Sequence, residues 1–432
     1  MKLRKVSAAL AATVITAGML AGCSVTPAPE EESGPVELTF WSWLRNTDKV
    51  VEAFNESHEN IQVKFEQIPG GADAITKVVN AARAGDAPDI FTVDYSVVSE
   101  LATQGILQDI SDLADEDIAS SFPEGIASLV QFGGGTWSVP LDAGALQLFY
   151  RADRFEELGI DVPTTWDEYK TAAAAVIAAD PNSRIGSSQA LDTPALLSAL
   201  AWQSGAQWAS IDGEAWGLDL ADEATVKAID FQQELVDEGL VWTDPGNVLG
   251  QKAAAGTYLS LISGTWQAAG LATSFPDQAG LWRVAPVPTW DGKPASAMYG
   301  GSSYGITADS THREAAYEFI KWMTQSPESI QARMGDGGAS LLPAATGLIP
   351  TAAASYDPAF YGGQDIYAEA QASLESINPG WVWNPATSVT NTALLDAVNK
   401  WKASGGVLSD SLEAVTATTE ANLTSRGIAV AD

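Results

Sequence analysis

Short segments in which apolar and polar residues alternate are separated along the chain by segments with an apolar residue at every third or fourth position. Residues 36–41 and 61–65 alternate, and residues 89–93 form a short apolar run, so all three segments predict β-strands. Two apolar stripes with helical spacing lie between them, at Val50, Val51 and Phe54 and at Ile75, Val78, Val79 and Ala82. Strands and helices that alternate in this way favour an α/β fold with a largely parallel sheet covered by helices.

Several residues mark the ends of the predicted helices. Gly85 is placed to end the second helix, and Ser96 can cap the helix that follows the third strand. Two capping boxes predict further helix starts, at Thr165 with Glu168 and at Thr311 with Glu314. Because ligands in such folds bind beyond the carboxyl ends of the strands, we expect functional residues directly after the strands.

The first residues have the layout of an export signal. Lys2, Arg4 and Lys5 precede an uncharged, Ala-rich apolar stretch at residues 6–20. This stretch is short for a membrane-spanning helix, which needs about 20 apolar residues. We therefore predict a secretory signal peptide at residues 1–22.

The signal peptide ends in the sequence Leu-Ala-Gly-Cys, residues 20–23. This sequence resembles the bacterial lipobox, in which the cysteine is acylated and becomes the new N-terminus. Cys23 is also the single cysteine of the chain, so no internal disulfide can form. We predict lipidation of Cys23, a flexible tether at residues 23–35, and a location outside the cytoplasm at the cell membrane.

The composition limits the class of protein. The 22 Lys and Arg and 55 Asp and Glu give a net charge of −33, and so acidic a chain repels the phosphates of nucleic acids. With two histidines, one cysteine and no phosphate-binding loop, the sequence predicts neither a metal site nor a cofactor. The roughly 400 residues beyond the tether exceed one core and predict two lobes.

Several blocks of sequence follow one another in the order found in a known family. They lie at residues 38–41, 54–63, 84–91, 104–107, 139–142, 148–150, 163–168, 263–266, 299–306 and 319–323. In these blocks the chain resembles the extracellular sugar-binding proteins of ABC importers, which are related to maltodextrin-binding protein.

The resemblance implies a two-lobed α/β fold of the periplasmic-binding-protein type (class II), with discontinuous lobes joined by a hinge of several strands. We expect an N-terminal lobe at residues 36–144 and 300–340, and a C-terminal lobe at residues 145–299 and 341–432. The chain should cross between the lobes near residues 142–146, 300–304 and 340–344. Gly144, Gly300 and Gly301 suit hinge segments that must absorb changes in φ and ψ.

Tryptophans near the predicted strand ends are candidates for sugar contacts. A sugar offers weakly apolar C–H faces and a rim of hydroxyls, so it binds aromatic platforms and a few fixed polar groups. Trp43 follows the first strand, and Trp266 lies where a strand turns into the next helix. The resemblance implies stacking on Trp266 and on the loop that carries Trp381 and Trp383. Core packing is the alternative for these four residues, and it is the expectation for Trp41.

Polar groups at the same predicted edge complete the candidate site. Carboxylates suit sugar hydroxyls because hydrogen bonds to charged groups are about twice as strong as neutral ones. Asp94 and Tyr95 end the third strand, Asp142 lies at the first crossing, and Asp192 lies in a turn before a helix. Backbone N–H groups and hydroxyls at the second crossing are candidate donors, in Gly301, Ser302 and Ser303. With 55 acidic residues in the chain, chance placement is the alternative for each carboxylate.

The chain departs from maltodextrin-binding protein inside the expected cleft. Gly144 stands where that protein carries a carboxylate, and Ser96 and Val97 stand where it carries an acidic–basic pair. Maltose specificity therefore does not follow from the resemblance. An anionic ligand would need an arginine clamp, and Arg45 is the single arginine near a predicted cleft segment, so we expect a neutral sugar.

Enzymatic functions are alternatives to binding. Residues 301–305 match the G-x-S-x-G pattern of serine hydrolases, but that motif needs an acid and then a histidine downstream. The chain has only His58 and His312, and His312 follows the motif at once. A glycoside hydrolase also pairs carboxylates with tryptophans, and a binder of a non-sugar solute can share this fold.

The sequence thus predicts a substrate-binding lipoprotein of an ABC transporter and not an enzyme. We expect it to capture a mono- or oligosaccharide in a cleft between the lobes, to close about its hinge, and to deliver the sugar to a membrane permease. The expected partners are the carbohydrate, the permease subunits and, through the lipid, the membrane. The protein itself should be a monomer.

Overall fold

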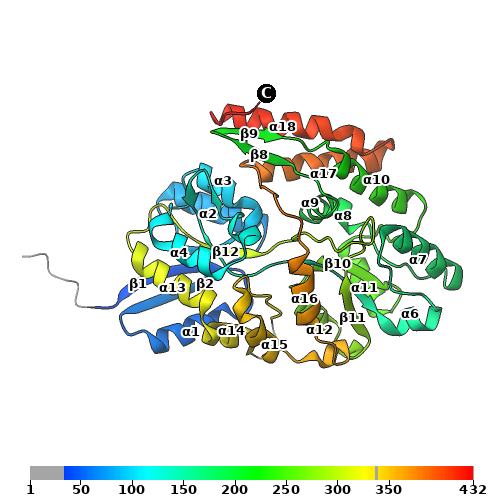
Figure 1. Cartoon of the computed structure of the whole chain (residues 1–432), viewed down its shortest axis with the longest axis horizontal. Helices are drawn as coiled ribbons and strands as arrows, with labels where there is room; N and C mark the ends of the chain where they lie inside the picture. The colour runs from blue at the N-terminus through cyan, green and yellow to red at the C-terminus, as the bar shows by residue number, and fades with distance from the viewer. Residues whose placement is uncertain (1–33, 336–338, 432) are drawn as a thin grey trace, which may run out of the picture. The chain divides into compact units, whose positions relative to one another are not determined.

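Five strands form the first of two main sheets in the computed structural model, which describes residues 34–335 and 339–431. The strand order is β2-β1-β3-β12-β6 (Figure 1). β1 pairs in parallel with β2 and β3, whereas β12 pairs antiparallel with β3 and β6. The strands span Val36–Ser42 (β1), Ile61–Gln67 (β2), Ile90–Asp94 (β3), Val139–Pro140 (β6) and Ser302–Ile306 (β12).

Each face of the first sheet is covered by its own helices. On one face, the ring of Phe319 in α13 contacts both Phe40 of β1 and Phe54 of α1, with centroid distances of 5.6 and 4.6 Å. On the other face, Phe91 of β3 shares a buried cluster with Val78 of α2. The helices around this sheet are α1 (Thr47–Ser57), α2 (Ala72–Ala84), α3 (Val98–Thr103), α4 (Ser111–Ser121), α5 (Glu124–Ala127), α13 (Arg313–Gln325) and α14 (Pro327–Met334).

A second sheet has the order β10-β7-β11, and both of its strand pairs are antiparallel. The expectation of a largely parallel sheet is therefore wrong for this half of the molecule, because apolar periodicity predicts a strand without its direction. The strands span Leu146–Arg151 (β7), Ser260–Gly264 (β10) and Trp282–Pro286 (β11). Nearby helices are α6 (Ala152–Leu158), α7 (Trp166–Ala179), α8 (Gln189–Asp192), α9 (Pro194–Gln203), α10 (Glu223–Asp237), α11 (Gly246–Ala254) and α12 (Gln267–Ser274).

The C-terminal part of the chain adds further helices and a hairpin. The hairpin consists of β8 and β9, and Val430 pairs with Trp216 of β9, so the end of the chain extends this hairpin. These elements are α15 (Ile349–Ala354), α16 (Ile366–Glu375), α17 (Thr387–Ser404), α18 (Leu412–Ser425), β8 (Ala209–Asp212) and β9 (Ala215–Leu218). A second small hairpin joins Gln131–Phe132 (β4) and Gly135–Thr136 (β5).

Three segments lie hydrogen-bonded side by side between the two sheets. Asp142 bridges to Pro343, and Ala145 bridges to Met298. The Tyr299 N–H also donates to the Gly144 carbonyl at 2.8 Å. A Cβ atom at Gly144 would lie 2.4 Å from the carbonyl oxygen of Tyr299, so the close approach of these two segments requires glycine.

The local helix signals are confirmed in part. α2 ends at Gly85 with φ of 75°, and Thr165 and Glu168 form the predicted capping box of α7. The box at Thr311 is wrong, because α13 begins at Arg313 with His312 as its N-cap. The preceding turn is held by the Ser310 hydroxyl, which donates to Asp89 Oδ1 at 2.6 Å.

The chain divides into two units, Met1–Pro35 and Val36–Asp432. The predicted signal peptide and Cys23 lie outside the described residues. Within the described ranges, none of the helices is both long and apolar enough to cross a membrane.

Candidate functional site

The candidate site lies at the carboxyl ends of β1 and β3. These strands are parallel neighbours, so the residues that follow them emerge at the same edge of the sheet. Trp43 follows β1 and is half-buried, and a Cβ atom at Gly70 would lie 3.1 Å from its Cγ. The loop after β2 thus supports one side of the Trp43 ring.

Asp94 ends β3 and is half-buried at this edge. Its Oδ1 accepts hydrogen bonds from the backbone N–H of Ser96 at 2.9 Å and from the Ser96 hydroxyl at 2.6 Å. Burial raises the pKa of the Asp94 carboxyl, and the two bonds from Ser96 oppose that rise. The expectation that Ser96 caps the next helix is therefore wrong, because Asp94 caps the following turn and Ser96 donates to it.

Trp266 is the most exposed tryptophan of the described chain, with 40% of its surface accessible. Its Nε1 donates to the Tyr299 carbonyl at 2.9 Å, and its ring leans on the Tyr299 ring at 60° with centroids 5.4 Å apart. The orientation of the indole is thus held while part of its surface remains open to solvent. An aromatic platform of this kind can stack on the C–H face of a sugar.

Asp94 ends β3 of the first sheet, Trp266 follows β10 of the second sheet, and the two side chains meet at Gly300. The position of a Cβ atom at Gly300 lies 3.2 Å from Trp266 Nε1 and 4.0 Å from Asp94 Oδ2. Gly300 also has φ of 74°, a conformation that other residues rarely adopt. A glycine here leaves space between an aromatic platform and a carboxylate. Tyr299, which sequence reasoning missed, completes this group.

Asp142 lies deeper, at the first of the three adjacent segments, with 6% of its surface exposed. Its Oδ1 accepts a hydrogen bond from the Ser302 N–H at 2.6 Å. Burial raises the pKa of its carboxyl to about 6, although the Ser302 hydrogen bond and the Arg333 charge oppose the rise. Asp142 and Ser302 therefore bond to each other across adjacent segments.

Tyr95, Gly301 and Ser303 lie beneath the open part of the site. The Tyr95 ring is 1% exposed, and burial raises the pKa of its hydroxyl well above the usual range. A Cβ atom at Gly301 would lie 2.9 Å from that ring. The Ser303 hydroxyl has no exposed surface and donates to the Val93 carbonyl at 3.1 Å. The structure does not bring these side chains to the Trp266 surface.

The Trp381–Trp383 loop separates its two tryptophans. Trp381 is 2% exposed and stacks on Trp202, with centroids 5.1 Å apart and planes 8° apart. It lines a cavity of about 420 Å³ with Met298. Trp383 is half-buried and meets Trp381 edge to face. Trp383 is thus the more accessible member of the pair, and Trp202 is a packing partner that sequence reasoning missed.

Asp192 lies at a groove on the C-terminal side of the molecule. It forms an ion pair with Lys402, and both side chains are partly exposed. The groove measures about 620 Å³ and is also lined by Gln267, the residue directly after Trp266. Asp192 thus lies near the start of α12, whose N-cap is Trp266. Sequence reasoning missed Gln267, and its place directly after Trp266 is the one signal that could have indicated it.

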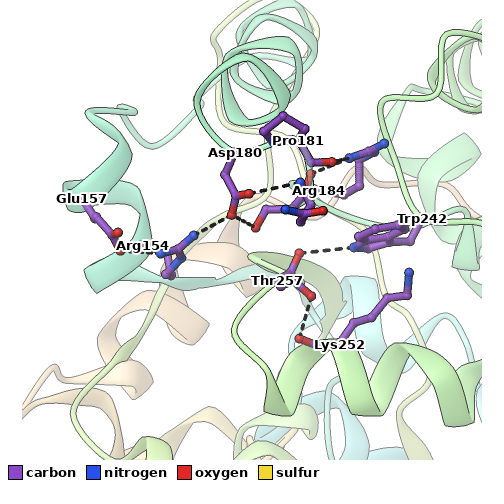
Figure 2. A network of polar contacts seen from close by, with 10 residues as sticks. Arg154, Glu157, Asp180, Pro181, Arg184, Trp242, Lys252 and Thr257 are labelled. Carbon is purple, nitrogen blue, oxygen red and sulfur yellow. Dashed lines mark hydrogen bonds and ion pairs between the residues drawn. The ribbon is translucent and has the colours of Figure 1, made fainter.

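A second polar cluster in the same half of the molecule has a structural role (Figure 2). Arg184 and Lys252 both lie over the Trp242 ring, 4.8 and 3.0 Å from its centroid. The Trp242 Nε1 donates to the Thr257 carbonyl at 3.2 Å, and Arg184 donates to the Pro181 carbonyl at 2.9 Å. These contacts join neighbouring segments of the chain.

The geometry does not support a serine-hydrolase site. Ser303 lies within strand β12 and is buried, whereas the nucleophile of the G-x-S-x-G motif stands exposed on a strand-to-helix turn. Within residues 34–335 and 339–431, no group of three or more His, Cys, Asp or Glu side chains is arranged to hold a metal ion.

Comparison with known proteins gives consistent matches. The model of the family described as bacterial extracellular solute-binding protein matches residues 42–329. A lactose-binding protein of Rhizobium radiobacter is 27% identical over 379 residues, which are 82% of this chain and 86% of that protein. A maltotriose-binding protein of Pyrococcus abyssi is 25% identical over 85% of this chain and 79% of its own length.

A solved structure is similar over nearly the whole chain. It is the galacto-N-biose-/lacto-N-biose I-binding protein of the ABC transporter from Bifidobacterium longum, in complex with lacto-N-biose. The TM-score is 0.80 at 28% identity, and the match covers 93% of this chain and 100% of the other. The fold is therefore the two-lobed α/β fold of these binding proteins.

Proposed function

Because the chain belongs to the family of bacterial extracellular solute-binding proteins, we propose that it captures a neutral oligosaccharide between its lobes for an ABC importer. Relatives that bind lactose, maltotriose and lacto-N-biose support this class of ligand. The B. longum relative belongs to an ABC transporter, which supports a role in import. The family is described as solute-binding, which supports binding as the function of this chain.

One observation carries the proposal for this chain. The partly exposed Trp266 ring, which follows β10, and the Asp94 carboxylate, which ends β3, both lie next to Gly300. A sugar ring bound there stacks on the indole and donates a hydroxyl hydrogen to the carboxylate. Trp43 and Trp383 are the further aromatic contacts that we propose.

The proposed lobes follow the distribution of the strands. The first sheet uses strands from residues 36–144 and 300–340, and the second uses strands from residues 145–299. A ligand that touches both lobes favours the closed arrangement, because only differential contact shifts such an equilibrium. Closure about the hinge segments then traps the sugar.

The family is extracellular, so the chain acts outside the cytoplasm. We further propose that residues 1–22 are removed, that Cys23 carries lipid, and that residues 23–35 tether a monomeric binding protein to the membrane. The tether would hold the protein close to the permease.

A thermal-shift measurement with lactose, maltotriose and lacto-N-biose tests the proposed ligand class. A ligand that binds only the folded state stabilises it by about 2.7 kcal/mol at 100 times its Kd. At least one of these sugars should raise the Tm, and chromatography should recover it intact. No shift with any of the three sugars contradicts the proposed ligand class, and cleavage favours a glycoside hydrolase.

A further inference from the structure

The N-terminus of α17 is capped by a carboxylate from a distant part of the chain. Its N-cap is Ala386, whose methyl side chain cannot accept a hydrogen bond. The N–H of Ser388, in the first turn, instead donates to Glu100 Oε2 at 2.9 Å. Glu100 belongs to α3 in the proposed N-terminal lobe, whereas α17 belongs to the proposed C-terminal lobe. A negative charge at the N-terminus of a helix interacts favourably with the helix dipole.

A neighbouring residue of α3 bonds to the loop that precedes α17. The Ser99 hydroxyl donates to the carbonyl oxygens of Trp383 at 2.7 Å and Asn384 at 3.1 Å. Ser99 is 3% exposed and Glu100 is 8% exposed, so both contacts are shielded from water. Because Trp383 is a proposed sugar contact, the Ser99 hydrogen bond links α3 to the candidate site.

The C-terminal helix reinforces the same junction. Arg426, which follows α18, donates to the Thr103 hydroxyl of α3 at 2.8 Å and to the Pro385 carbonyl at 2.5 Å. Figure 1 shows α3 next to the C-terminal elements. The junction therefore consists of polar bonds to one face of α3, and Asp94 precedes that helix by only four residues.

We propose that Ser99 and Glu100 form an interlobe latch that stabilises the closed state and thereby raises sugar affinity without touching the sugar. The proposal rests on the proposed closure of the lobes. Separation of the lobes would return the carboxylate and the Ser388 N–H to water, so the latch contributes only to the closed state. Apparent affinity falls in proportion to the fraction of protein in the binding-competent state.

The variant Glu100→Ala removes the capping carboxylate from α3. We expect about a 10-fold loss of affinity for lactose, maltotriose or lacto-N-biose, whichever the wild type binds, mainly through faster dissociation. Glu116→Ala is the matched control, because it removes the same charge from an exposed position on α4 of the same proposed lobe. Equal affinity and dissociation rates for these two variants would overturn the latch.

A second pair of variants keeps the test valid if Glu100→Ala fails to fold. Glu100→Gln retains the shape and an acceptor but loses the charge, and we expect a smaller loss of affinity. Ser388→Pro removes the donor at a position where a helix tolerates proline. Combining Ser388→Pro with Glu100→Ala should add no further loss, because both remove one interaction. Additive losses would overturn the direct bond.

A measurement without sugar separates the latch from the proposed ligand class. Spin labels at Lys64→Cys and Lys293→Cys, in full-length protein that carries Cys23→Ser, report the distance between the proposed lobes. Both lysines are exposed, at 65% and 82% of the side chain. Glu100→Ala should shift the distances away from the closed state. An unchanged distribution would overturn the latch even if sugars bind, whereas a shift without sugar binding would contradict only the ligand class.

Discussion

Replacing Trp266 with alanine removes the platform on which the proposed sugar stacks. A large aromatic side chain buries up to about 250 Å², so the 40% of Trp266 that is exposed corresponds to about 100 Å². A sugar that covers between half and all of this area gains about 1.3 to 2.5 kcal/mol at about 25 cal/mol per Å². Trp266→Ala should therefore weaken binding about 8- to 70-fold.

Isothermal titration calorimetry with the sugar that stabilises the wild type measures this loss, and circular dichroism checks the fold. Trp266→Phe keeps a smaller ring and should lose less affinity than Trp266→Ala. Trp242→Ala is the matched control, because its indole lies in the separate polar cluster and should not affect affinity (Figure 2). Wild-type affinity in a folded Trp266→Ala variant would refute the stacking assignment.

Two further predictions concern the membrane and the hinge. Cys23→Ser should release folded protein into the soluble fraction, because two or three acyl chains anchor firmly and none remains; retention in the membrane fraction would count against lipidation. Asp142 has a pKa of about 6 in the folded state against an ordinary 3.8, so the folded state favours the protonated carboxyl. This preference adds about 3 kcal/mol to the free energy of unfolding at low pH, and that stabilisation is lost as the pH rises through 6. Asp142→Asn should therefore be more stable than wild type at pH 8 but not at pH 4, as measured by thermal denaturation; an identical pH dependence would contradict the buried, ionising Asp142.

The sequence predicted those parts of the site that depend on position after a strand. Asp94 is recognisable as the end of a strand, and Trp266 as a residue after a strand that matches a stacking tryptophan of the family; the structure places both next to one glycine. Ser303 was also a candidate because it lies at the second expected crossing, yet in strand β12 its buried hydroxyl donates to the Val93 carbonyl of the neighbouring strand. Alternation along a segment predicts two faces but does not indicate which face the neighbouring strands will cover.

Contacts between distant segments were beyond the reach of local patterns. Tyr299 supports Trp266 from 33 positions away, and Glu100 caps α17 from 288 positions away. Neither pair has a spacing that a helix or strand repeat produces. Trp381 and Trp383 are two residues apart and were indistinguishable in the sequence, but Trp202 stacks on one of them and buries it. Such differences depend on which elements pack together in the folded chain.

Small-angle X-ray scattering during a sugar titration tests most directly whether the protein traps its ligand between two lobes. The full-length protein with Cys23→Ser is measured with the sugar among lactose, maltotriose and lacto-N-biose that raises the Tm most. The account predicts a smaller radius of gyration at saturation, reached at the same sugar concentrations as calorimetric binding. An unchanged radius at saturation would contradict capture by closure.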